Sequence, residues 1–295
     1  MAGISGAGIT SLGARVLAIG GILLAVVCQA PAFAQSGGTL ERIKNQGEVR
    51  LAFRADATPF SYIENNRPAG YSVELCLEVA HALQQQLKMP EMTVSFVEVT
   101  AENRFDAITQ GKADLLCEAT SATLSRRERM DFSISTFVSG ASLAIQQDGP
   151  TSFEKLADKK VGVLGGTTTQ EDLDITLREH SISAEVIVVK THDEGLDLLK
   201  KGQIAAYFAD RTILQQRLRD AAAGGKLLLA DNYLTIEPYA LAMPIDHDFR
   251  LAVDRALSRL FRTGGMIKVF RGTFDADAKP SELLKMLSRV SGLPE

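Results

Sequence analysis

The stretch MTVSFVEVTAENRFDAITQGKADLLC, residues 92–117, carries the pattern that decides the fold. Apolar residues alternate with polar ones at its start, which predicts a strand over residues 92–99. A short helix is expected over residues 101–110, ending at Gly111. Residues 113–117 are mostly apolar and form a second predicted strand. The stretch therefore reads as strand, helix and strand.

The residues before this stretch extend the same alternation. Residues 49–53 read as a strand and residues 65–70, NNRPAG, as a turn. We expect Ser72 to cap the next helix. The inward stripe of that helix repeats every three to four residues and consists of Cys76, Val79, Ala80, Leu83 and Leu87. This strand–helix order implies parallel strand pairing with helices on both faces of the sheet.

A second cycle of the same kind follows a break near Gly140. Its predicted strands are residues 161–164, 185–189 and 204–209. Residues 165–169 open a predicted helix that runs to about residue 179, and further helices are predicted over residues 193–201 and 210–222. The C-terminal residues, 246–261 and onward to 287, show helical periodicity and are predicted to be helical. Two extended stretches, residues 137–144 and 233–242, are expected to cross between the two α/β units, which makes a hinge and a cleft.

Composition excludes several classes of protein. The chain has 295 residues, of which 45% are hydrophobic and 23% charged, so it is globular and long enough for two domains. Its formal net charge is −4 and no basic stripe occurs, so nucleic acid is not an expected partner. Only four histidines are present, and none forms a ligand motif with a cysteine. We expect neither a metal nor a cofactor.

The N-terminus resembles a secretory signal. Arg15 precedes an apolar run over residues 16–27, and small residues at Ala32 and Ala34 suit a signal peptidase. We predict a signal peptide over residues 1–34 and an exported mature protein; an uncleaved anchor is the alternative. Bulky Val27 before Cys28 argues against lipid attachment.

Export changes the interpretation of the cysteines. Once the signal is removed, Cys76 and Cys117 remain, and an oxidising compartment allows them to form a disulfide. We favour the bond over the alternative, in which the two side chains are buried separately as small hydrophobic groups.

Common catalytic signatures are absent from the sequence: it has no Gly-x-Ser-x-Gly, P-loop, His-Glu-x-x-His or Gly-x-Gly-x-x-Gly motif. Gly165, Gly166 and Thr167 lie where a strand turns into a helix, so their backbone N–H groups could hold an anion. The alternative role for threonine at this point is a helix cap.

Two segments resemble a known signature. KADLLC (112–117) followed by TSATLSRRERMDFS (120–133) is similar to the periplasmic solute-binding proteins for polar amino acids that serve ABC importers. TPFSY (58–62), GYSVEL (70–75), the Gly-Thr-Thr turn and YFAD (207–210) agree in order along the mature chain.

The resemblance implies the type II periplasmic-binding-protein fold, an α/β architecture with two lobes. Each lobe would have a central mixed sheet flanked by helices, and the ligand would bind in the cleft between them. Lobe 1 is expected to comprise residues 35–138 and 239–295, and lobe 2 residues 139–238. A monomer in the periplasm is implied, with a membrane permease as its partner.

The resemblance also implies residue roles. Arg126 matches the arginine that grips the α-carboxylate of the amino acid, a bidentate task that lysine performs less well. Ser121 and Thr168 match hydroxyl donors to the same carboxylate, and Asp210 matches the acceptor of the α-ammonium. The alternatives are a surface charge for Arg126 and a helix N-cap for Asp210.

Departures from the commonest pattern bear on the ligand. Many relatives sandwich the ligand between aromatic rings, whereas this chain has Ala57 and Ala101 at those places and offers Arg54 and Arg104 nearby. These residues resemble the glutamate/aspartate-binding branch, as does His192, for which a cap or surface role is the alternative. Against that branch, Ala101 and Ala119 stand where its members have serine, and glutamate is not distinguished from aspartate.

We therefore expect a binding protein, not an enzyme, that takes a polar, acidic amino acid and delivers it to an ABC importer. The main alternative is a dehydratase of the prephenate or arogenate type on the same fold, with Glu118 and Asp210 as acids. A sensory module that presents ligand to a receptor is the third class.

Overall fold

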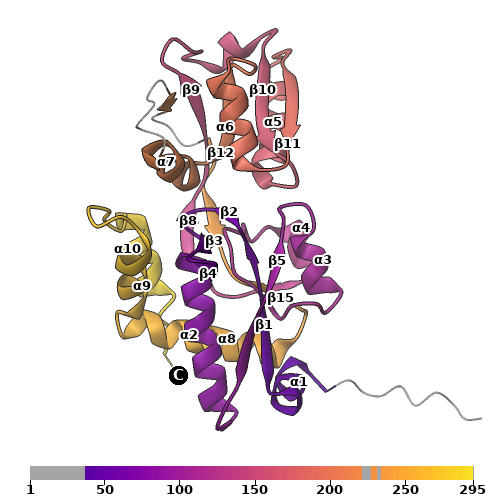
Figure 1. Ribbon diagram of the computed structural model, residues 1–295, viewed down its shortest axis with the longest axis vertical. Helices are drawn as coiled ribbons and strands as arrows, with labels where there is room; N and C mark the ends of the chain where they lie inside the picture. The colour runs from indigo at the N-terminus through magenta and orange to yellow at the C-terminus, as the bar shows by residue number, and fades with distance from the viewer. Residues whose placement is uncertain (1–36, 221–226, 231–233, 295) are drawn as a thin grey trace, which may run out of the picture. The chain divides into compact units, whose positions relative to one another are not determined.

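The computed structural model describes residues 37–220, 227–230 and 234–294. The predicted signal peptide, including Cys28, lies outside the described residues. Two five-stranded mixed sheets, each flanked by helices, organise the described chain (Figure 1).

The first sheet has the strand order β5–β1–β6–β15–β7. Strand β1 (Glu48–Arg54) pairs in parallel with β5 (Thr93–Val99) and β6 (Leu115–Leu116), as the strand–helix alternation predicts. Strand β15 (Ala242–Met243) returns from late in the chain and pairs antiparallel with β6 and β7 (Asp131–Phe132). The sheet is therefore mixed.

Alternate residues of β1 face the two layers of helices. Val49 and Leu51 belong to the core that includes α2 (Tyr71–Gln86) and α8 (His247–Arg262), whereas Ala52 packs with α3 (Arg104–Thr109) on the opposite face. This period of two is what a strand buried on both faces requires. The remaining helices of this lobe are α1 (Thr39–Gln46), α4 (Leu124–Arg127), α9 (Gly265–Thr273) and α10 (Glu282–Val290).

The prediction that Ser72 caps α2 is wrong. The helix begins at Tyr71, and its N-cap is Gly70, two residues before Ser72, at φ +116°. A Cβ on Gly70 would lie 2.5 Å from the carbonyl oxygen of Phe60, so the close approach of the two backbones requires glycine. The first N–H groups of the helix, on Tyr71 and Ser72, donate to the carbonyls of Pro59 and Phe60. Backbone carbonyls thus replace the expected side-chain cap.

A small antiparallel sheet lies beside α2. Its strands are β2 (Asp56–Ala57), β3 (Ser61–Glu64) and β4 (Arg67–Ala69). Asn65 and Asn66 form the turn between β3 and β4 with positive φ, a conformation that asparagine tolerates. The turn predicted over residues 65–70 is too long, because residues 67–69 form β4.

The second sheet has the order β11–β10–β12–β9–β13. Strand β10 pairs in parallel with β11 and β12, while β9 is antiparallel to β12 and β13. The strands are β9 (Ala141–Gln146), β10 (Lys160–Leu164), β11 (Glu185–Val189), β12 (Ala206–Asp210) and β13 (Leu227–Leu229). The helices are η1 (Phe153–Leu156), α5 (Thr168–Glu179), α6 (His192–Lys200) and α7 (Arg211–Asp220).

Two short strands connect the sheets. Strand β8 (Phe137–Ser139) pairs antiparallel with β14 (Glu237–Tyr239), at the two stretches predicted to cross between the units. The strands of the first sheet all fall within the ranges expected for lobe 1, and those of the second within lobe 2. The precise lobe boundaries stay a prediction, and residue 233 lies outside the described residues.

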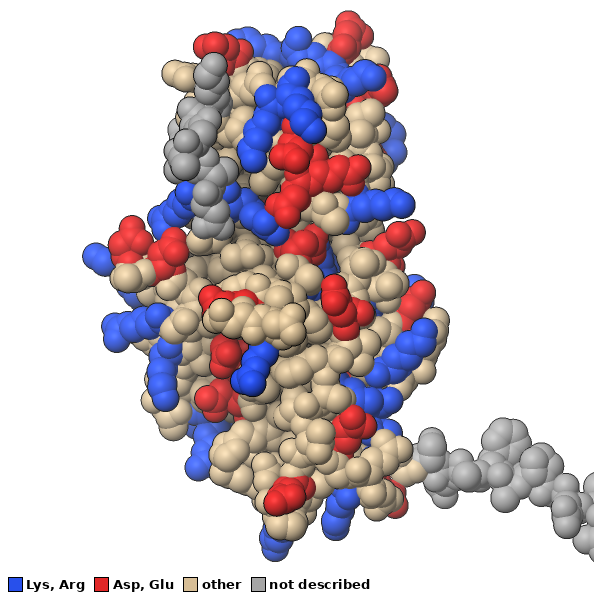
Figure 2. Space-filling view, viewed as in Figure 1, with Lys and Arg blue, Asp and Glu red and all other residues tan. Residues whose placement is uncertain are grey.

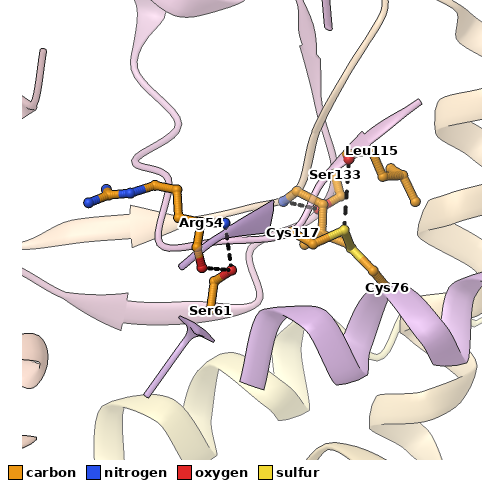
Figure 3. Close-up of a disulfide and its surroundings, with 7 residues drawn as sticks. Arg54, Ser61, Cys76, Leu115, Cys117 and Ser133 are labelled. Atoms are coloured by element: carbon orange, nitrogen blue, oxygen red, sulfur yellow. Dashed lines mark hydrogen bonds between the residues drawn. A yellow bond between two sulfur atoms is a disulfide. The ribbon is translucent and has the colours of Figure 1, made fainter. Parts of the chain in front are cut away.

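The predicted disulfide is present. Cys76, in the middle of α2, is bonded to Cys117, which directly follows β6, with a Cα–Cα distance of 6.0 Å (Figure 3). Both residues are fully buried in the core of lobe 1. The bond ties α2 to the sheet next to Glu118.

The visible surface carries charges of both signs, interspersed with each other (Figure 2). This distribution agrees with the small net charge and gives no broad basic face there. None of the helices in the described ranges combines the length and apolarity that crossing a membrane requires.

Candidate ligand-binding site

A cavity of about 40 Å³ lies where the two lobes contact each other. Its volume leaves room for a few water molecules at most. All seven side chains that the sequence predicts to hold the ligand line it: Arg54, Arg104, Ser121, Arg126, Thr168, His192 and Asp210.

Five of these residues stand at the ends of strands or the beginnings of helices. Arg54 and Asp210 are the last residues of β1 and β12, while Arg104, Thr168 and His192 are the first of α3, α5 and α6. In open α/β sheets the carboxyl ends of parallel strands and the following helix starts share one edge. That edge in each lobe forms one wall of the cavity.

Arg126 is held in place from two sides. Its Nη1 donates to the carbonyl of Ser121 at 2.9 Å, and its guanidinium carbon lies 4.8 Å from the centre of the Phe105 ring. Thr123 caps α4 by accepting from the backbone N–H of Arg126. Burial lowers the pKa of Arg126, opposed by the charge of nearby carboxylates, first that of Glu118. Arg126 is partly buried and lines the cavity, which favours the predicted site role over a surface charge.

Ser121 and Thr168 reach the cavity from opposite lobes and meet there. Their hydroxyl oxygens lie 3.3 Å apart. Both hydroxyls donate to the same oxygen, Oε2 of Glu237, at 2.5 Å for Thr168. The two groups expected to bind a ligand carboxylate therefore already bind a carboxylate of the chain.

Glu237 is a site residue that sequence reasoning missed. It is 8% exposed, and its other oxygen, Oε1, accepts from the Thr235 hydroxyl at 2.8 Å. One sequence signal could have found it: an acid in the otherwise apolar and hydroxylic stretch LTIEPY, residues 234–239, that crosses between the lobes. A buried acid in such a stretch needs partners.

The glycine-rich turn before α5 is a helix cap and a point of close approach. Thr167 is the N-cap, accepting from the N–H of Gln170, which confirms the capping alternative for this residue. A Cβ on Gly166, at φ +69°, would lie 3.1 Å from the carbonyl oxygen of Ala101 in the other lobe. Arg104 Nη2 donates to the Gly166 carbonyl at 2.9 Å, so the lobes are in direct contact here.

Asp210 has the capping role considered for it, while its role toward a ligand ammonium stays a prediction. Its Oδ1 accepts from the N–H of Ile213, as an N-cap of α7 does, and its Oδ2 accepts from the Tyr239 hydroxyl. Burial raises the pKa of Asp210 to about 6, against hydrogen bonds led by that of Ser139, which lower it. A cation placed beside this carboxylate would favour its charged form.

The raised pKa of Asp210 predicts two opposite pH dependences. If the ligand ammonium binds the ionised form, affinity should fall by up to about tenfold per unit as pH drops below about 6, because a proton must first leave. The ligand-free fold binds more protons than the unfolded chain between the two pKa values. Its stability should therefore rise as pH falls through about 6. Calorimetric titration and thermal melts from pH 5 to 8 measure both.

The control for this prediction is Asp210→Asn, which keeps the shape and the oxygen acceptor but cannot titrate. The variant should bind more weakly and lose both pH dependences. An affinity that stays constant from pH 5 to 8 in the unmodified protein contradicts the role of Asp210.

His192 is buried and neutral. Its Nδ1 lies 2.9 Å from the Tyr207 hydroxyl, and burial lowers its pKa to about 3. Nε2 is buried with no hydrogen-bond partner among the described residues. The cap of α6 is Thr191, so neither the cap nor the surface alternative holds for His192. In the described part of the chain no cluster of His, Cys, Asp and Glu side chains could hold a metal ion.

Arg54 and Arg104 share one buried acid. Oε2 of Glu118 lies 3.3 Å from Arg54 Nη1, and its Oε1 lies 3.0 Å from Arg104 Nε. The Nε–H of Arg104 is not directed at that oxygen, so this contact is an ion pair without a hydrogen bond. Glu118 is 1% exposed and does not line the cavity. Burial lowers the pKa of Arg104 to about 10, which keeps it charged at neutral pH.

Solved structures share this fold. The cysteine-binding protein of Campylobacter jejuni superimposes with a TM-score of 0.71 at 23% identity, over 82% of this chain and 96% of that one. An ancestral amino-acid-binding protein described as a precursor of cyclohexadienyl dehydratase gives 0.69 at 24% identity, over 81% and 100%. At these identities the likeness shows the fold alone, and it confirms the two-lobed architecture expected from the sequence.

The family follows from the sequence match. Residues 49–275 match the bacterial extracellular solute-binding proteins, family 3, and the chain belongs to that family. It is 27% identical over 266 residues to the L-glutamate/L-aspartate-binding protein of Pseudomonas aeruginosa, covering 88% of each chain. It is 26% identical over 251 residues to the glutamate/aspartate import solute-binding protein of Escherichia coli K12, covering 84% of this chain and 83% of that protein.

Proposed function

We propose that this protein captures an amino acid with an acidic side chain, glutamate or aspartate, and delivers it to the permease of an ABC importer. The observation that carries the proposal is the cavity that side chains of both lobes line together. The names of the relatives in Pseudomonas aeruginosa and Escherichia coli support the choice of ligand.

The α-carboxylate of the ligand would bind between Arg126, Ser121 and Thr168. The Glu237 carboxylate accepts from both hydroxyls in this structure, so it must turn away before the ligand carboxylate replaces it. After this exchange Ser121 and Thr168 would still donate two hydrogen bonds to a carboxylate, and the guanidinium of Arg126 would donate to the same ligand carboxylate. Charge-assisted bonds of this kind contribute roughly 1.5–3 kcal/mol each.

The other two charged parts of the ligand find partners on the remaining walls. Asp210 would accept the α-ammonium, which neutralises a buried carboxylate. Arg54 and Arg104 would face the side-chain carboxylate, and the unpartnered Nε2 of His192 can donate to it or accept from it.

Capture depends on closure of the two lobes. Lobe 1 contributes Arg54, Arg104, Ser121 and Arg126, and lobe 2 contributes Thr168, His192 and Asp210. Because only the closed form presents both sets, a ligand that contacts both shifts the hinge equilibrium toward closure. The closed surface is then what the permease recognises.

The setting proposed is the periplasm, reached through cleavage of residues 1–34, with the mature protein acting as a monomer without a cofactor. Its role is binding, not catalysis. The dehydratase alternative uses Glu118 as an acid toward the substrate, but Glu118 faces two arginines and does not line the cavity. A sensory role would use the same closure, with a receptor in place of the permease.

A thermal-shift panel of the twenty amino acids and small dicarboxylates tests the proposal. Ligand at about a thousand times its dissociation constant should raise the melting temperature by roughly 10 °C, and L-glutamate and L-aspartate should give the largest shifts. D-Glutamate is the matched control, because its inverted α-carbon cannot place carboxylate and ammonium on Arg126 and Asp210 together.

Two results would overturn the proposal. Stabilisation by basic amino acids alone would reject the roles of Arg54 and Arg104. Consumption of prephenate or arogenate by the purified protein would support the dehydratase alternative instead.

A further inference from the structure

Glu118 forms a buried ion-pair cluster with the two arginines proposed to face the ligand side chain. It directly follows Cys117 at the carboxyl end of β6, and the Thr120 hydroxyl donates to its Oε1 at 2.5 Å. Its two oxygens face Arg54 and Arg104, one each. All three side chains are at most 3% exposed.

The chain already engages most N–H groups of both guanidiniums, and only Arg54 Nη2 and Arg104 Nε are buried without a hydrogen-bond partner among the described residues. Arg54 also donates Nε to Asp56 Oδ1 at 2.9 Å, with Nη2 2.8 Å from the same oxygen. Arg104 donates Nη1 to the carbonyl of Ala101 and Nη2 to that of Gly166. Two acids, the buried Glu118 and Asp56, whose side chain is 20% exposed, thus offset the charges of the two buried arginines on this wall of the cavity.

We propose that Glu118 is a specificity-determining residue that lets the site accept amino acids with amide side chains, asparagine or glutamine, nearly as well as the acids. The inference rests on the proposed function and refines it. Glu118 supplies the negative charge that an acidic ligand side chain would otherwise supply to the arginines.

The chemistry of this wall suits a neutral polar group. The carbonyl oxygen of a ligand amide can accept from the arginine N–H groups, and its NH₂ group can donate. The neutral imidazole of His192 can accept or donate through its unpartnered Nε2. An acidic side chain gains little from its extra charge here, because the wall is balanced, and it must still lose its water shell.

The experiment is calorimetric titration of the ligand-stripped protein with L-aspartate, L-asparagine, L-glutamate and L-glutamine. In the unmodified protein the acid and the amide of equal length should bind within about tenfold of each other. In Glu118→Gln, which leaves one cation unbalanced at nearly the same shape, the preference for the acid over its amide should rise by at least about tenfold. Glu118→Asp, which keeps the charge, should stay near the unmodified ratio.

Asp114→Asn is the matched control. Asp114 directly precedes β6, whereas Glu118 follows that strand, and both side chains are buried. Like Glu118, Asp114 pairs with two arginines: Arg42 at 2.5 Å and Arg50 at 2.8 Å. It does not line the cavity. Losing its charge should lower stability in the same way as Glu118→Gln but leave the acid-to-amide ratio unchanged.

The outcomes separate the inference from the proposed function. If the unmodified protein prefers the acid over its amide by more than about a hundredfold, the inference is wrong, and this result does not depend on any variant. The inference is also wrong if Glu118→Gln folds and its acid-to-amide affinity ratio equals that of the unmodified protein. If none of the four ligands binds a protein that melts cooperatively, the proposed function fails instead.

Discussion

Replacement of Arg126 by lysine is expected to weaken amino-acid binding by about a hundredfold and to leave the melting temperature of the ligand-free protein almost unchanged. The guanidinium can donate to the Ser121 carbonyl and to a ligand carboxylate together while it rests on the Phe105 ring. An ammonium group is a single compact charge without this fork. The loss of one or two charge-assisted bonds, at roughly 1.5–3 kcal/mol each, corresponds to about a hundredfold.

Arg127→Lys is the matched control for this substitution. Arg127 lies next in the same short helix and also rests on an aromatic ring, with its guanidinium carbon 5.3 Å from the centre of Phe132, but it does not line the cavity. Titration calorimetry should show near-normal affinity for this variant. Equal losses in both variants, or a ligand-free Arg126→Lys protein that melts many degrees lower, would mean that Arg126 acts as a structural residue.

Removal of the disulfide is expected to lower the free energy of unfolding by about 4 kcal/mol, the largest stability effect predicted here. Cys76 and Cys117 are 41 residues apart in the sequence, and the chain-entropy model assigns a closed loop of that length about 4 kcal/mol. Urea unfolding of Cys76→Ala/Cys117→Ala beside the unmodified protein measures the difference. Both cysteines lie in the core of lobe 1, so the double variant also loses packing, which adds to the loss from the bond itself.

Reduction of the unmodified protein separates these two contributions. A thiol reductant should destabilise the unmodified protein and leave the double variant unaffected. If thiol counting shows complete reduction and the urea midpoint does not move, the bond contributes nothing to stability and its predicted role is wrong.

Much of the fold could be predicted from the sequence because the signals are local. The alternation of strand and helix depends on apolar spacing within ten to fifteen residues, and the strand predicted over residues 185–189 matches β11 residue for residue. The cap of α2 could not be predicted from such spacing. It depends on contact of Gly70 with Phe60, which the β3–β4 hairpin before the helix brings together.

For the candidate site as well, some features could be predicted from the sequence and others only from the tertiary structure. The resemblance of the sequence to a known family indicated seven side chains as ligand-binding, and all seven line one cavity. The sequence also paired Cys76 with Cys117, because export leaves only two cysteines. Tertiary structure alone decided which acids share the cavity and its walls. Glu237 meets Ser121 across 116 residues, and Glu118 meets Arg54 across 64. Such partners, and the burial that raises the pKa of Asp210, arise only when distant segments pack together and exclude water.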